Sequence, residues 1–128
     1  MAHILIIEDD NDERELFKIA LERSGYDVMD APNGKVGLDL YYKQPCPVVI
    51  TDIFMPEREG LETIFALRRE FFGVRIIAIS GGSTMGHRGG AFQADEALSV
   101  AKAAGADRTL AKPIDLKELV KTVEELLL

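Results

Sequence analysis

The stretch HILIIEDD (residues 3–10) joins an almost uninterrupted apolar run to three consecutive acids. A short run of β-branched and leucine residues without polar alternation is typical of a strand buried on both faces of a parallel sheet. VVITD (residues 48–52) and RIIAIS (residues 75–80) repeat this pattern, and each also ends in a polar side chain. With two less apolar runs, they predict five strands at His3–Ile7, Asp27–Ala31, Val48–Asp52, Arg75–Ser80 and Arg108–Ala111.

Helical patterns fill the intervals between these runs. This alternation predicts an α/β fold, in which helices cover both faces of an open parallel sheet and the weaker strand 27–31 lies near an edge. Asn11 or Asp12 is the predicted N-cap of the first helix, whose core-facing side holds Leu16, Phe17, Ala20 and Leu21. Further helix boundaries are predicted at Asn33, Pro45, Gly60 and Asp115.

The composition limits the classes of function. The chain has 128 residues, 47% hydrophobic and 29% charged, so we expect one globular domain over residues 1–128 and no output domain. A formal net charge of -7 repels a nucleic-acid backbone and argues against direct nucleic-acid binding. We see no apolar stretch of membrane-spanning length and no signal-peptide pattern, and Cys46 is the only cysteine, so we expect a cytoplasmic protein without membrane contact.

Polar residues follow four of the predicted strands. Glu8, Asp9 and Asp10 follow the first, Asp52 and Ser80 end the third and fourth, and Lys112 follows the fifth. Right-handed crossovers bring the carboxyl ends of parallel strands to one edge, where ligands of such folds bind. Gathered carboxylates repel one another unless a cation joins them, and oxygen ligands suit Mg²⁺. Asp52 is then a candidate nucleophile toward phosphorus, with Lys112 and Ser80 contacting phosphoryl oxygens.

Each of these residues also has an ordinary structural interpretation. An aspartate at a strand end is more often a helix cap or turn residue, the three acids alone fit a solvated turn, and Lys112 alone fits a surface charge. Their arrival at four strand ends, in an order that fits one site, favours the functional interpretation.

Several motifs carry a family resemblance: IIEDD (residues 6–10), TDIFMP (residues 51–56) with Gly60, ISG (residues 79–81), GAD (residues 105–107) and KP (residues 112–113). In this order, over essentially the whole chain, they resemble the receiver (response-regulator, CheY-like) domain of two-component signalling. The resemblance implies a flavodoxin-like (βα)5 fold in three α/β/α layers, with strand order 2-1-3-4-5.

The resemblance also implies roles for individual residues. Asp52 is expected to be phosphorylated, Asp9 to bind Mg²⁺ directly and Glu8 to bind it through water. The carbonyl oxygen of Phe54 is expected to complete the metal ligands that the protein supplies. Lys112 and Ser80 keep the roles given above, and the Lys112–Pro113 bond is expected to be cis.

The implied partners are a sensor histidine kinase or histidine phosphotransfer protein, and a downstream protein contacted after a conformational change. A homodimer through the face made by the fourth helix, fifth strand and fifth helix is also implied. The domain would catalyse its own phosphorylation and slow dephosphorylation, so we do not expect an enzyme with a separate turnover substrate.

Two features depart from the family pattern. Thr109 occupies the position three residues before the lysine, where an aromatic residue usually couples phosphorylation to the output face, so the usual switch is in doubt. The glycine-rich segment Gly81–Gly90 belongs to a region about ten residues longer than in typical receivers. It is interpreted either as a solvated loop or as a lid whose amides and Arg88 meet the phosphoryl group or the partner kinase.

Two alternative functions remain open at this stage. One is a phosphorylation-independent interaction module with a receiver-like fold, although Asp52 and Lys112 are both retained. The other is a hydrolase that forms an aspartyl phosphate, which needs a second carboxylate as general acid or base and a substrate pocket for which no segment is evident.

Overall fold

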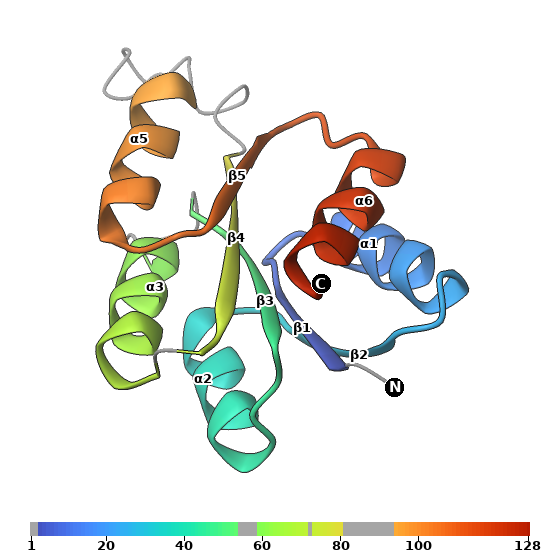
Figure 1. Ribbon diagram of the computed structural model, residues 1–128, viewed down its shortest axis with the longest axis horizontal. Helices are drawn as coiled ribbons and strands as arrows, with labels where there is room; N and C mark the ends of the chain where they lie inside the picture. The colour runs from blue at the N-terminus through green and yellow to red at the C-terminus, as the bar shows by residue number, and fades with distance from the viewer. Residues whose placement is uncertain (1–2, 54–58, 72, 81–93) are drawn as a thin grey trace.

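A computed structural model describes residues 3–53, 59–71, 73–80 and 94–128. Its strands have the predicted bounds: β1 (His3–Ile7), β2 (Asp27–Ala31), β3 (Val48–Asp52), β4 (Arg75–Ser80) and β5 (Arg108–Ala111). They form one parallel sheet in the order β2-β1-β3-β4-β5 (Figure 1). The predicted fold class and strand order are confirmed, as is the edge position of β2.

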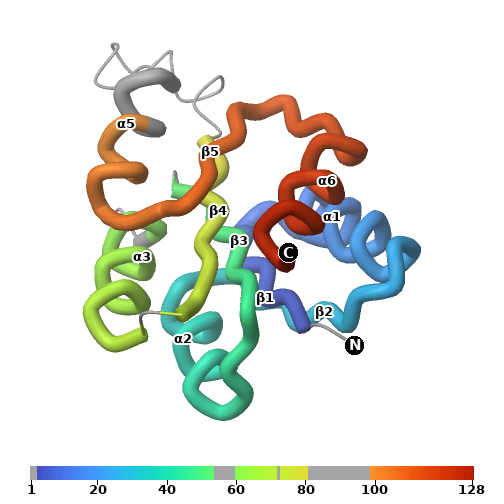
Figure 2. The backbone as a smooth tube through the Cα atoms, viewed as in Figure 1, coloured from blue at the N-terminus to red at the C-terminus, as the bar shows by residue number. Residues whose placement is uncertain are grey.

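Helices lie on both faces of this sheet. They are α1 (Asn11–Arg23), α2 (Gly34–Lys43), α3 (Glu59–Glu70), α5 (Ala94–Ala104) and α6 (Leu116–Leu126). The pair α1 and α6 covers one face, and α2, α3 and α5 cover the other, which gives the three α/β/α layers (Figures 1 and 2). Within the described ranges, we find no helix with both the length and the apolar character needed to cross a bilayer.

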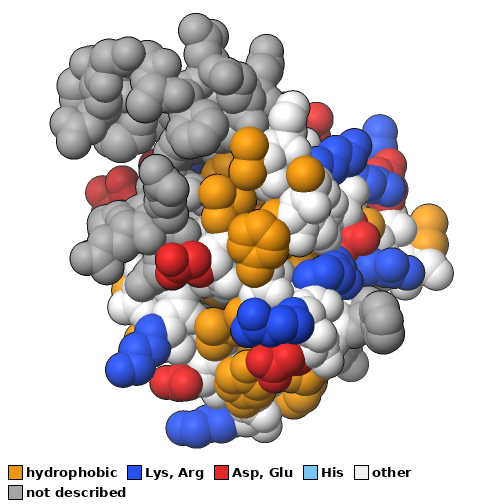
Figure 3. Space-filling model, turned by 90° about the vertical axis from the view of Figure 1, so that its left-hand side faces the viewer, with side chains coloured by type: hydrophobic (Ala, Val, Ile, Leu, Met, Phe, Trp, Pro, Cys, Tyr) orange, Lys and Arg blue, Asp and Glu red, His pale blue; other side chains and the backbone are white. Residues whose placement is uncertain are grey.

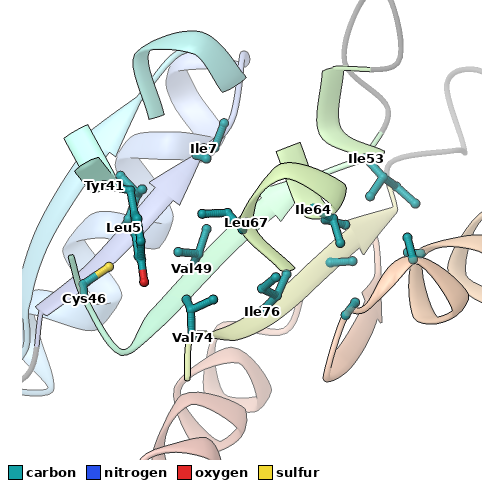
Figure 4. Packing of buried hydrophobic residues seen from close by; sticks show 14 of the residues in the cluster. Leu5, Ile7, Tyr41, Cys46, Val49, Ile53, Ile64, Leu67, Val74 and Ile76 are labelled. Atoms are coloured by element: carbon teal, nitrogen blue, oxygen red, sulfur yellow. The ribbon is translucent and has the colours of Figure 1, made fainter. Parts of the chain in front are cut away.

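Alternate side chains of the central strands enter two separate apolar cores. Ile4 and Ile6 of β1 pack with residues of α1 and α6, whereas Leu5 and Ile7 pack with residues of α2 and α3. Figure 4 shows the second core, with Leu5 and Ile7 beside side chains from β3, β4 and α3. Each such buried side chain stabilises the fold by about 1.5–3 kcal/mol, so the strand ends that carry polar residues are held in place.

Two helix starts agree with the sequence. The side chain of Asn33 accepts a hydrogen bond from the Val36 N–H at the start of α2, and Asp115 caps α6 in the same way. The second helix ends at Lys43, two residues before Pro45. At the starts of α2 and α6, a short polar side chain satisfies amide groups that the first turn of a helix leaves unpaired.

The predicted cap of α1 is wrong. Asp10, rather than Asn11 or Asp12, has an extended backbone (φ -79, ψ 116), and its carboxylate accepts the N–H groups of Asp12 and Glu13. The helix therefore begins one residue earlier than a cap at Asn11 predicts, and two earlier than a cap at Asp12 predicts, so only Glu8, Asp9 and Asp10 separate it from β1. This brings its first turn to the edge of the sheet where the acids lie.

The predicted core face of α1 is only partly correct. Phe17 and Leu21 are buried against the sheet, but Leu16 is 53% exposed. Leu16 and Ala20 instead border a shallow apolar groove between α1 and α6, whose other wall includes Val120. The helix is thus turned so that one edge of its apolar stripe faces its neighbour rather than the sheet.

Candidate functional site

Three carboxylates meet at the carboxyl edge of the sheet. Glu8 and Asp9 follow β1, Asp52 ends the adjacent strand β3, and one oxygen of each lies within 4.8 Å of the others. Glu8 and Asp52 are 1% and 2% exposed, whereas Asp9 is exposed to solvent. The structure therefore brings the predicted acids together, with two of them removed from water and one accessible.

Lys112 enters this cluster from the other side. Its Nζ donates to Asp52 Oδ2 at 2.7 Å and to Glu8 Oε1 at 3.1 Å, and it lies 2.7 Å from Glu13 Oε1. The Lys112–Pro113 peptide bond that follows β5 is cis, as predicted. A residue just after β1, one in the first turn of α1 and one at the end of β3 thus share the ammonium group of a lysine that follows β5.

Burial and charge act against each other in this cluster. Burial, reinforced by the charge of Asp52, raises the pKa of Glu8 from 4.5 to about 8. Burial also opposes the charged form of Lys112, but hydrogen bonds to Asp52 and Glu13 and the charges of Asp52 and Glu8 outweigh it, so the pKa of Lys112 is raised. The lysine therefore carries its positive charge at neutral pH. A further cation at the site would stabilise the ionised form of Glu8.

Ser80 ends β4 beside Asp52. Asp52 is in register with Ile79 of the neighbouring strand, so Ser80 lies one residue farther along toward the same edge. Its side chain is fully buried, and its hydroxyl has no hydrogen-bond partner among the described residues. A buried hydroxyl without a partner is costly, which is the arrangement expected where a ligand oxygen supplies the missing bond.

Of three other predicted features, only one falls on described residues. Phe54 and the Gly81–Gly90 segment with Arg88 lie outside the described residues. Thr109 lies on β5 in register with Ala78 and is half-buried.

Two supporting contacts were not predicted from the sequence. Arg14 on α1 donates from its guanidinium to the carbonyl oxygen of Glu8 at 2.7 Å and to Asp30 Oδ2 at 3.0 Å, which ties the acidic turn to the edge strand β2. Gly60 on α3 approaches the backbone of Asp52 and Ile53 so closely that a Cβ atom would lie 2.5 Å from the Cα of Ile53. A glycine beside a predicted site was the only available signal for the second contact.

The donor set of the acid cluster fits Mg²⁺. Glu8, Asp9 and Asp52 offer carboxylate oxygens only, the ligands that hard divalent cations prefer. Few protein ligands and an exposed Asp9 suit an ion that keeps several waters. The residues present therefore fit the metal, with Asp9, Asp52 and Glu8 as those that would hold it.

Comparison with known proteins agrees with this geometry. The family model for the response regulator receiver domain matches residues 4–124. The response regulator receiver protein CpdR of Brucella abortus is 32% identical over 129 residues, which cover 100% of this chain and 98% of CpdR. The transcriptional regulatory protein CpxR of Escherichia coli is 31% identical over 99% of this chain, but the match spans only 50% of CpxR.

Solved structures give the same result. A CheY-like receiver domain protein from Methanospirillum hungatei superimposes with a TM-score of 0.85 and 26% identity, over 99% of this chain and 94% of that protein. The response regulator TrrA from Thermotoga maritima, solved in complex with Mg²⁺-BeF, has a TM-score of 0.78 and 28% identity, over 98% of this chain and 99% of TrrA.

Proposed function

Because this chain belongs to the response regulator receiver domain family, we propose that it is a signalling domain that accepts a phosphoryl group on Asp52 in a Mg²⁺-dependent reaction. The observation that carries this proposal is the buried Asp52 carboxylate, which shares an edge of the sheet with two further acids and a charged lysine. Such a carboxylate is held in place and excluded from water, as a nucleophile toward phosphorus requires.

The proposed step is a direct displacement at phosphorus. A carboxylate oxygen of Asp52 bonds to phosphorus while the bond to the donor breaks, and the electron pair leaves with the donor. Lys112 is already 2.7 Å from Asp52 Oδ2, so it is positioned to neutralise charge on the phosphoryl oxygens. The Ser80 hydroxyl would donate the hydrogen bond for which it has no partner among the described residues.

The acid cluster supports Mg²⁺ as the cofactor. When bound, the ion would supply the positive charge that lets an anionic donor approach several carboxylates. Asp9 is the accessible ligand, while Glu8 is buried and already hydrogen-bonded to Lys112 and the Asp10 N–H, which favours a role through water. The Phe54 carbonyl is proposed as a further ligand.

A sensor histidine kinase or histidine phosphotransfer protein is the proposed donor. Leu16, six residues after the helix cap Asp10, is the first residue of α1 that lines the apolar groove between α1 and α6, and Leu16 and Ile19 are 53% and 39% exposed. Lys117 and Lys121 line the same groove. An exposed apolar surface beside the acceptor is suited to hold the protein that delivers the phosphoryl group.

Other parts of the function are also proposals. The domain is proposed to act in the cytoplasm, to have no turnover substrate of its own, and to signal by contact with a downstream protein. A homodimer through α5, β5 and α6 is one form that this contact would take. Thr109 at the usual aromatic position means that a different element would carry the conformational change.

Intact-mass measurement after incubation with acetyl phosphate and Mg²⁺ tests the proposal. We expect one phosphoryl adduct per chain that is stable in acid and lost in base, and no adduct in Asp52→Asn. In Lys112→Ala we expect metal binding to persist while the conformational response to phosphorylation weakens, because the lysine contacts the phosphoryl group. An unmodified parent chain, or an adduct that persists in Asp52→Asn, would contradict the proposal.

A further inference from the structure

Glu13 contacts the lysine of the site from an unexpected position. It is the third residue of α1, and its Oε1 lies 2.7 Å from Lys112 Nζ. Neither the pattern of strand ends nor the proposed metal site includes it. The contact places a third carboxylate, beside those of Glu8 and Asp52, on the charged group that the proposed reaction depends on.

The usual role of a glutamate at this position does not account for the contact. A glutamate three residues after the N-cap normally accepts a hydrogen bond from the backbone N–H of the cap residue. Here the N–H of the cap residue, Asp10, donates to Glu8 Oε2 at 3.1 Å. The Glu13 side chain is thus available to turn into the site, where it meets Lys112.

Among the described residues, Lys112 has as many carboxylate partners as it has hydrogens to donate. An ammonium group carries three N–H donors, and Asp52, Glu13 and Glu8 lie 2.7, 2.7 and 3.1 Å from Nζ. A phosphoryl oxygen on Asp52 therefore receives an N–H from Lys112 only if one partner gives way. The partner that gives way is the one whose carboxylate loses the least free energy when its contact with Lys112 is broken.

Burial distinguishes the three partners. The side chains of Asp52 and Glu8 are 3% and 2% exposed, so neither has water to replace a lost bond to Lys112. The Glu13 side chain is 36% exposed and can be hydrated as soon as it is released. Leaving a buried charge unpaired is costly, whereas exposed ion pairs contribute little.

We propose that Glu13 is a positioning residue that occupies one N–H of Lys112 in the unphosphorylated site and is displaced from it by the phosphoryl group. The inference rests on the proposed function, because it assumes that Asp52 is the acceptor. Glu13 competes with the incoming group, so it slows phosphorylation. Its release also frees a carboxylate on α1, beside the proposed groove for the donor.

Three variants separate the contact from the charge. Glu13→Gln removes the charge but keeps a hydrogen-bond acceptor of the same length, Glu13→Asp keeps the charge but shortens the side chain, and Glu15→Gln removes one charge from an exposed site on the same helix. We expect the first two to take phosphate from acetyl phosphate, and to bind beryllofluoride, about twofold to fivefold better than the parent chain, the span of an exposed ion pair. Glu15→Gln should match the parent.

Nuclear magnetic resonance of the lysine ammonium groups supplies a readout that a merely structural role would not move. The Lys112 signal should shift in both Glu13 variants, and in the parent on adding beryllofluoride with Mg²⁺, but not in Glu15→Gln. Equal phosphorylation of the parent, Glu13→Gln and Glu15→Gln would overturn the inference while leaving the proposed function intact. A parent chain that takes neither phosphate nor beryllofluoride overturns both, and the ammonium spectrum then still decides whether Glu13 binds Lys112.

Discussion

Replacing Gly60 with alanine is the sharpest structural test of how the site is held. The added Cβ would overlap the carbonyl oxygen of Asp52, and would lie 2.5 Å from the Cα of Ile53 and 2.9 Å from the carbonyl carbon of Asp52. These are backbone atoms, and β3 is paired with β1 on one side and β4 on the other. Because the strand has no room to move within the sheet, the first turn of α3 must shift away from it.

The size of the effect follows from two opposing terms. Overpacking against a fixed backbone costs about 3 kcal/mol, the upper part of the usual range. Alanine in a helix recovers about 1 kcal/mol relative to glycine. The net loss of about 2 kcal/mol should lower the melting temperature by about 6–10 °C in a domain of this size. Because the clash is with the residue that carries the reactive carboxylate, phosphorylation should also slow.

Thermal unfolding and intact-mass phosphorylation of the same variant measure both effects. Gly73→Ala is the matched control, since no described heavy atom lies within 4 Å of a Cβ at that position. It should change the free energy of unfolding by less than about 0.5 kcal/mol. A Gly60→Ala protein with parental stability and phosphorylation would show that the approach of α3 to β3 does not constrain Asp52.

Two further predictions address the donor surface and the buried acid. Leu16→Lys should lower phosphotransfer from a partner kinase at least about tenfold while leaving acetyl phosphate as effective as before, because it places a charge in the apolar groove. Phe65→Lys, on a residue of α3 that is 54% exposed, is the control, and equal losses in both variants would dismiss the groove. Without metal, the proton that Glu8 retains in the folded state stabilises the fold at low pH, and this contribution is lost as the pH rises from 4.5 to about 8. Denaturation across this range should show a falling free energy of unfolding that Glu8→Gln flattens, and a slope that persists in the variant would count against Glu8 as its source.

Phe65 is a suitable control because it belongs to a different exposed apolar surface, on the other side of the sheet from the groove. Figure 3 shows apolar side chains gathered over α2, α3 and α5, between acidic and basic groups. Phe65 and Val100 are among the exposed apolar residues of these helices. This surface lies across the sheet from α1 and α6, so a change there should not disturb a partner held in the groove.

The strand pattern predicted the fold because both faces of the sheet are buried. Ile4 and Leu5 enter opposite cores, so β1 has no polar alternation and can be recognised without any knowledge of its neighbours. The sequence does not determine the start of α1, because Asp10, Asn11 and Asp12 are all good caps and only the fold of the backbone distinguishes them. The exposure of Leu16 depends on where α6 packs, and the spacing of apolar residues in α1 does not predict that position.

The site was predictable to the extent that backbone topology determines it. Glu8, Asp9, Asp52 and Lys112 each stand at or just after a strand end, and parallel strands bring those ends together whatever the side chains are. Glu13 has no such position. Its contact with Lys112 depends on Asp10 being the helix cap and on the Asp10 N–H donating to Glu8, and neither fact follows from the sequence pattern.

Two glutamates thus contact the same ammonium group with opposite consequences. Glu8 has almost no access to water, and this burial raises its pKa to about 8 even beside Lys112, so its charged form at neutral pH needs a further cation. Glu13 is partly hydrated, so it gains less from Lys112 and loses less on leaving it. A site that must keep its lysine in place before phosphorylation and give it to the phosphoryl group afterwards needs one partner of each kind. The exposed fraction of the two side chains, rather than their residue type, therefore assigns the permanent contact to Glu8 and the exchangeable one to Glu13.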